Sequence, residues 1–258
     1  MLSASSMAVH TLGFLVVIIV VYVSWNPTAL FSWHPILMVV GIFVLILQGI
    51  VVYNSDSSLV AHSHPKKKFN FHWCLEAVGL LSISCGFMIA LYVKKLNGKP
   101  HFASWHGLLG LVVLIWCFAQ GICGVLHSFS LLRRFVRPAG SRILHALSGV
   151  FCFTFACLVC ALGLRSDWFG NAVINAFSDT GIQHLLTYIT NFFMILVCII
   201  LLKQVHEKYL LQYLFPRRPM ETVKAPTNAP KPMKSQRETK LNRRTKKSPT
   251  RSLILSQN

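Results

Sequence analysis

The sequence predicts an all-α membrane protein with six transmembrane helices and a disordered, basic C-terminal tail. Of the 258 residues, 54% are apolar and only 12% are charged, and the mean hydropathy is +0.56, which is too apolar for a soluble domain of this length. A helix needs about 20 mainly apolar residues to cross a bilayer. Six runs with almost no Asp, Lys or Arg approach or exceed this length, at residues 8–24, 31–53, 71–93, 104–126, 141–164 and 182–202.

Helices are the expected form of these runs. None of them alternates polar and apolar residues as the strands of a membrane barrel do. The run at 8–24 has no Lys or Arg before it and no small-residue cleavage site after it, so it is interpreted as a span rather than a signal peptide. The run at 31–53 carries Pro35 in its first turn, where proline costs a helix little. Residues 1–206 are therefore predicted to form one transmembrane domain.

The chain from Lys203 onward has a different composition. It holds 14 Lys or Arg against three Glu, which amounts to +11 of the net charge of +18, together with six prolines. High charge and few apolar residues predict a disordered tail over residues 207–258. Such a tail is attracted to anionic membrane lipid, and nucleic-acid binding is not expected of it on a six-span protein.

The loops predict which side of the membrane faces the cytosol. With six spans, both termini share one side with the loops 54–70 and 127–140. These two loops and the start of the fifth span carry seven Lys or Arg, whereas the three loops on the other side carry four. By the positive-inside rule, the chain is a multi-pass membrane protein with cytosolic termini. The sequence leaves open whether an endomembrane vesicle or the plasma membrane holds it.

Four histidines share one depth, about one turn inside spans two to five: His34, His72, His106 and His145. Ionisable side chains inside a membrane are costly and normally face a partner in the bundle interior. Spans two and four start on one side of the membrane, and spans three and five start on the other. His34 is therefore predicted to lie level with His106, and His72 with His145. The spacings agree, at 72 and 73 residues.

Each histidine pair suits a haem better than a bare metal ion. Zinc takes four ligands, and no acidic or thiol groups accompany the non-cytosolic pair. A b-type haem takes two axial nitrogens and apolar walls. We therefore expect a central four-helix bundle, made of spans two to five, that holds two haem b groups.

Small residues and one carboxylate lie one helical turn after three of these histidines. Gly110 and Gly149 follow the third and fourth histidines, where they leave room for a flat macrocycle, although glycine also eases helix contact in general. Glu76 follows His72 and is the one carboxylate within the six predicted spans. It can hydrogen-bond a haem propionate, orient a ligand, relay a proton or simply satisfy a polar neighbour.

The pattern resembles that of the cytochrome b-561 family, and within it the short transmembrane reductases of the ascorbate-dependent type. The matching stretches are FSWHP at 31–35, FHW at 71–73, HGLLGLVVLIWCFAQGICG at 106–124 and LHALSG at 144–149. Members of the family carry two bis-histidine b haems and pass single electrons from cytosolic ascorbate to monodehydroascorbate or ferric iron. The resemblance implies such an enzyme here, with His34 and His106 on the iron of the non-cytosolic haem and His72 and His145 on the iron of the cytosolic haem.

The resemblance also implies a substrate rim on each side. Ascorbate is an anion, so Lys67, Lys68 and Arg142 are the candidates to bind it on the cytosolic side, and the positive-inside signal explains the same charges equally well. On the other side, Lys99 is the candidate to attract an anionic acceptor or chelated iron. No catalytic side chain beyond the haem ligands is expected, because the haem irons carry the chemistry.

Two other functions stay open on the sequence alone. A haem-free transporter would use the intramembrane histidines and Glu76 as a proton or metal relay, but no clear inverted repeat is present. A structural or assembly protein would recruit partners through the basic tail. The oligomeric state is also open, a homodimer included.

Overall fold

The computed structural model describes residues 4–54, 58–128 and 138–210, and within these ranges the chain is helical and has no strand. Among the described residues, six helical stretches are long and apolar enough to cross a membrane: Ala4–Ser24, Leu30–Val51, Pro65–Leu96, Trp105–Ser128, Gly140–Gly163 and Gly181–Tyr209. The predicted all-α, six-span fold class is confirmed, and the chain is a multi-pass membrane protein. Most of the predicted tail, from residue 211 onward, lies outside the described residues.

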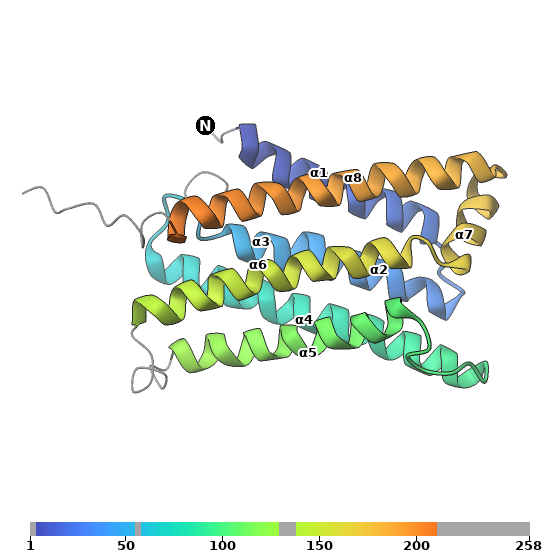
Figure 1. Cartoon of the computed structure of the whole chain (residues 1–258), viewed down its shortest axis with the longest axis horizontal. Helices are drawn as coiled ribbons and strands as arrows, with labels where there is room; N and C mark the ends of the chain where they lie inside the picture. The colour runs from blue at the N-terminus through green and yellow to red at the C-terminus, as the bar shows by residue number, and fades with distance from the viewer. Residues whose placement is uncertain (1–3, 55–57, 129–137, 211–258) are drawn as a thin grey trace, which may run out of the picture. The chain divides into compact units, whose positions relative to one another are not determined.

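The four middle spans form two packed pairs. The second span, which begins with α2 (Trp33–Val39), packs against α4 (Pro65–Leu96), and α5 (Trp105–Ser128) packs against α6 (Pro138–Gly163). Consecutive spans run in opposite directions (Figure 1). Val113 is the one buried residue of α5, so this helix has little packing beyond its contact with α6.

The first and last spans form a third pair. α1 (Ala4–Ser24) and α8 (Thr180–Val205) lie side by side, and they also contact α2 and α6 respectively (Figure 1). α1 buries Val16 and Val20, while Phe14 on another face is 60% exposed. A helix that is apolar on its buried and its exposed faces is typical of a membrane span, because lipid solvates the outer face.

The second span is not a regular α-helix. A 3₁₀ turn, η1 (Leu30–Ser32), precedes α2, and a π-helical segment, η2 (Val40–Ile46), separates α2 from α3 (Leu47–Val51). At Gly41, in η2, the backbone approaches α4 so closely that a Cβ would lie 2.6 Å from Cγ2 of Ile83. The π-helical segment is therefore one of the places where the second span makes close contact with α4.

Two helices extend beyond the predicted spans. α4 begins at Pro65, six residues before the predicted span, and the His64 side chain accepts a hydrogen bond from the Lys66 backbone N–H at 3.3 Å. The last span continues beyond residue 202 into a π-helical turn, η4 (His206–Leu210). A search for uncharged apolar runs stops at lysine, whereas a helix can continue through lysine into the interface.

One described helix lies in a region predicted as a loop. α7 (Asp167–Phe177) is capped by the Ser166 hydroxyl, which accepts from the Phe169 N–H at 3.3 Å. Phe169 and Val173 are buried. The helix has 11 residues, so it is too short to cross a bilayer and gives no span-length apolar run.

Candidate functional site

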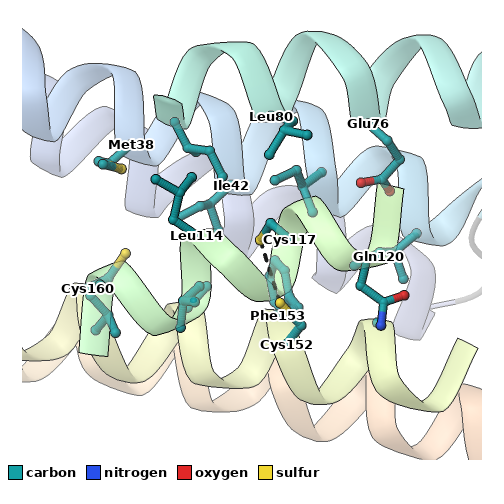
Figure 2. A pocket seen from close by; sticks show the side chains of 18 of the residues that line it. Met38, Ile42, Glu76, Leu80, Leu114, Cys117, Gln120, Cys152, Phe153 and Cys160 are labelled. Atoms are coloured by element: carbon teal, nitrogen blue, oxygen red, sulfur yellow. Dashed lines mark hydrogen bonds between the residues drawn. The ribbon is translucent and has the colours of Figure 1, made fainter. Parts of the chain in front are cut away.

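A cavity of about 2170 Å³ is bordered by all four middle spans, and its lining is mainly apolar. The four intramembrane histidines all line it: His34, His72, His106 and His145. Figure 2 shows its middle, where Leu80 from α4 and Leu114 from α5 project between the two helix pairs. A pocket for one small molecule has about 300–1,000 Å³. The cavity therefore has room for two ligands of that size.

His34 and His106 lie together at one end of the cavity, here called the His34 end. Their ring centroids are 6.1 Å apart and the ring planes meet at 83°. Nδ1 of His34 lies 2.9 Å from the carbonyl oxygen of Gly86, and Nδ1 of His106 lies 2.9 Å from that of Val159. Since a carbonyl oxygen only accepts, each Nδ1 carries the proton and donates it. Each Nε2 then keeps a lone pair for a ligand.

His72 and His145 lie together at the other end, here called the His72 end. Their ring centroids are 6.2 Å apart and the planes meet at 86°. Nδ1 of His72 donates to the carbonyl oxygen of Gly49 at 2.9 Å. Nδ1 of His145 is buried and has no hydrogen-bond partner among the described residues. The ring of Tyr53 packs against that of His72, with centroids 5.3 Å apart.

Both pairs fit the axial positions of a haem iron. A metal–imidazole nitrogen bond is about 2 Å long, so two rings on opposite sides of one metal have centroids roughly 6 Å apart. A ligand histidine commonly donates its other N–H to a carbonyl, which fixes its tautomer. Within the described part of the chain, no group of three or more His, Cys, Asp or Glu side chains converges. Each end therefore offers two nitrogens, a donor set that fits haem and not tetrahedral zinc.

Glycines leave space beside the histidines. A Cβ on Gly110 would have Val159 Cγ1 as its nearest neighbour at 3.7 Å, and one on Gly149 would have Gln120 Oε1 at 3.8 Å. Both glycines line the cavity. Gly163 is tighter, because a Cβ there would lie 3.0 Å from Cε1 of His106.

Glu76 lies beside His72 and lines the cavity. Its Oε1 is 3.8 Å from Nδ1 of His72, which is longer than a hydrogen bond. The carboxyl group packs against Gly49, where it leaves no room for a Cβ. Figure 2 shows Glu76 on α4 and Gln120 on α5, both at the same part of the cavity. The carbonyl of Gly49, and not Glu76, therefore orients the His72 ring.

Polar contacts also link α5 to α6. Sγ of Cys117 and Sγ of Cys152 are 3.5 Å apart (Figure 2). Nε1 of Trp116 donates to the Ser148 hydroxyl at 3.0 Å. These contacts hold the α5–α6 pair together between the two histidine ends.

The part of the chain that holds the four histidines matches a known protein family. The profile of the family described as eukaryotic cytochrome b561 matches residues 33–170, which is just over half of the chain and includes all four cavity histidines. The chain belongs to the cytochrome b561 family. The resemblance seen in the sequence is confirmed.

Individual cytochrome b561 proteins match over 105 to 169 residues. A Bos taurus protein named transmembrane reductase CYB561D2 is 31% identical over 169 residues, which cover 65% of this chain and 75% of the relative. A Mus musculus protein named probable transmembrane reductase CYB561D1 is 23% identical over 165 residues, covering 64% and 72%. A Mus musculus protein named lysosomal membrane ascorbate-dependent ferrireductase CYB561A3 is 30% identical over 105 residues, covering 39% and 41%.

At the His72 end of this cytochrome b561 protein, only one of the three residues predicted to bind ascorbate is among the described residues that line the cavity. Arg142 lines the cavity, whereas neither Lys67 nor Lys68 is among the described residues that line it. Lys208 does line it, next to Tyr53. Lys208 falls in the predicted tail, residues 207–258, so the sequence pattern did not identify it as a site residue. A Lys–Tyr pair within two helical turns of the end of an apolar run is typical of a helix end at the membrane interface, and this was the available signal.

At the His34 end, the predicted acceptor residue Lys99 is exposed and is not among the described lining residues. Lys94 and Arg165 line the cavity there instead. Lys94 donates to the carbonyl of Pro100 at 3.4 Å, and Arg165 donates to that of Ala161 at 3.2 Å. The positive rim at this end of the cavity is thus made by the end of α4 and by the residues that follow α6.

Proposed function

We propose that this protein is a transmembrane dihaem oxidoreductase that passes single electrons from cytosolic ascorbate to monodehydroascorbate or ferric iron on the opposite side. The observation that carries the proposal is the pair of histidine sites at the two ends of one apolar cavity. In each, two imidazole rings stand about 6 Å apart. The relative named an ascorbate-dependent ferrireductase supports the choice of donor and of one acceptor.

In this proposal His34 and His106 hold the iron of one haem b, and His72 and His145 hold the iron of the other. When bound, each haem supplies a reversible one-electron change at its iron. The chain itself orients three of the four imidazoles through backbone carbonyls. Its apolar lining keeps water away from the space between the two ends.

The proposal places the His72 end at the cytosol, in accord with the distribution of Lys and Arg between the loops. The transmembrane domain, predicted to end at residue 206, then extends through η4 to residue 210, and the residues of the predicted tail beyond it are cytosolic. Arg142 is a donor-side residue, because it lines the cavity at this end. Lys94 and Arg165 are the acceptor-side cations.

The test is an absorbance spectrum of the purified full-length protein, first oxidised and then with ascorbate. We expect b-type bands that ascorbate reduces, with a stoichiometry of two haems per chain. A colourless protein would contradict the proposal and favour the transporter alternative. Bands that dithionite reduces but ascorbate does not would keep the haems and exclude ascorbate as donor.

A second measurement separates the acceptors. The protein is inserted into vesicles loaded with ascorbate, and either a ferric chelate or monodehydroascorbate is supplied outside. We expect haem reoxidation by at least one of the two acceptors. No reoxidation by either would contradict transmembrane transfer.

A further inference from the structure

We propose that Lys208, in the last span, binds the anionic electron donor at the His72 end of the cavity and sets the protein's preference for an anionic donor. The inference rests on the proposed function, because it assigns a binding residue to the donor site of that reaction. It concerns a residue outside the family match, which ends at residue 170. Three features support it: the position of the ammonium group, its surroundings and the places of the other cations.

Lys208 is held in place by groups from two distant parts of the chain. It belongs to the π-helical turn η4 and lines the cavity. Its Nζ donates to the carbonyl oxygen of Tyr53, 155 positions earlier in the chain. The same Nζ lies 5.8 Å from the ring centroid of Tyr53 and 5.1 Å from that of Tyr209. A lysine between two aromatic faces has lost much of its freedom to move into solvent.

This arrangement puts a positive charge close to a proposed haem ligand. The ring of Tyr53 contacts Lys208 through cation–π interaction and contacts the His72 ring at 5.3 Å. One side chain therefore separates the ammonium group from His72.

The ammonium group keeps the capacity to bind an anion. A lysine has three N–H donors, and the Tyr53 carbonyl takes one. Among the described residues Lys208 has no carboxylate partner, since Glu207 pairs with Lys203 at 3.9 Å. A half-buried cation without a counter-charge is costly, and an anion that enters the cavity mouth removes that cost. An enediol anion such as ascorbate also accepts hydrogen bonds from the two remaining N–H groups.

The neighbouring lysines do not offer the same site. Lys67, Lys68 and Lys203 are not among the described lining residues, and the side chain of Lys203, five residues before Lys208, is 70% exposed. Lys203 therefore provides a matched control with the same charge, on the same span, away from the cavity.

The first experiment compares Lys208→Gln, Lys208→Arg and Lys203→Gln in the purified holoprotein. We expect Lys208→Gln to raise the KM for ascorbate about tenfold at low ionic strength, as loss of one charge-assisted hydrogen bond predicts, with kcat and the haem spectrum unchanged. Lys208→Arg should recover most of the loss. Reduction by an uncharged hydroquinone should be the same in all variants, because it does not use the ammonium charge.

The second experiment reads binding without electron transfer. The protein is first reduced completely with dithionite, then treated with an amine-acylating reagent with and without ascorbate, and the acylated lysines are quantified by mass spectrometry. We expect ascorbate to slow acylation of Lys208 several-fold and to leave Lys203 unchanged.

The outcomes separate this inference from the proposed function. If ascorbate does not reduce the wild-type haems, the proposed function fails. If ascorbate reduces them while the KM of Lys208→Gln equals that of wild type and Lys208 is not protected, the inference fails and the proposed function stands. An equal rise in KM for Lys203→Gln would also overturn the inference, since it would indicate general surface attraction.

Discussion

The two ends of the cavity have almost the same histidine geometry and different surroundings. The histidine rings are 6.1 and 6.2 Å apart, and the ring planes meet at 83° and 86°. At the His34 end, both Nδ1 atoms donate to backbone carbonyls. At the His72 end only His72 does so, and within the described residues the Nδ1 of His145 has no acceptor. The spacing of the histidine rings and the hydrogen bonds that orient them are therefore separate properties of this bundle.

The second difference is polarity. Glu76 and Tyr53 lie against His72, whereas the nearby charges at the His34 end are the cations Lys94 and Arg165 at the rim. Hydrogen bonds and charge around a haem set its reduction potential. We therefore expect two haems with the same ligands to titrate at different potentials.

The largest expected effect comes from removing one ligand at a time. His106→Ala should lose the haem of the His34 end and His72→Ala that of the His72 end, so each variant should retain about half of the haem, in spectrally different halves. A pyridine haemochrome assay and a reduced-minus-oxidised spectrum measure both quantities. Loss of the same spectral component in both variants would contradict two separate sites.

The next effect tests steric support at the two ends. Gly163→Ala places a Cβ 3.0 Å from Cε1 of His106, whose ring is already held by Val159, so we expect a destabilisation of about 1–3 kcal/mol and weaker haem retention at the His34 end. Gly124→Ala places a Cβ 3.6 Å from Cε1 of His145, an ordinary contact, and should be neutral or slightly stabilising. Thermal unfolding followed at the haem band measures both. Equal losses of stability in Gly163→Ala and Gly124→Ala would contradict the expected difference in steric support between the two ends.

A smaller effect is expected from the polar group beside His72. Glu76→Leu replaces a polar group beside His72 with hydrocarbon. A less polar surrounding disfavours the more highly charged ferric state, so the midpoint potential at the His72 end should rise, on the order of tens of mV. The potential at the His34 end should stay the same. A spectroelectrochemical titration resolves the two potentials, and Ser82→Ala, which removes a hydrogen bond to Leu37 near His34, is the control for the other end. A change in the midpoint potential at the His34 end in Glu76→Leu would contradict this prediction.

The smallest effect is expected midway between the ends. Trp116→Phe removes the hydrogen bond to Ser148 and keeps an aromatic ring near Phe155, whose centroid is 5.7 Å away. We expect a loss of about 1 kcal/mol in unfolding free energy and no change in either potential. Denaturant unfolding and the redox titration check the two parts. A large fall in electron transfer between the haems would instead assign Trp116 to the electron path.

The number of spans and the histidines that share a level follow from local features of the sequence. Apolar length is a local property, and alternation of spans places His34 with His106 and His72 with His145 without any packing information. The same reasoning missed α7, because an 11-residue helix has no span-length signal. It also ended the last span before Lys208, because charge in the interface looks like the start of a tail.

The hydrogen-bond acceptor of each histidine and the charged residues that line the cavity depend on the tertiary structure. The acceptors of His34, His72 and His106 are the carbonyls of Gly86, Gly49 and Val159, which lie 52, 23 and 53 positions away in the chain. A helix carbonyl accepts from a neighbouring helix only when both helices have the right rotation and distance. Those two quantities depend on side-chain packing across the whole bundle, and no short stretch of sequence encodes them.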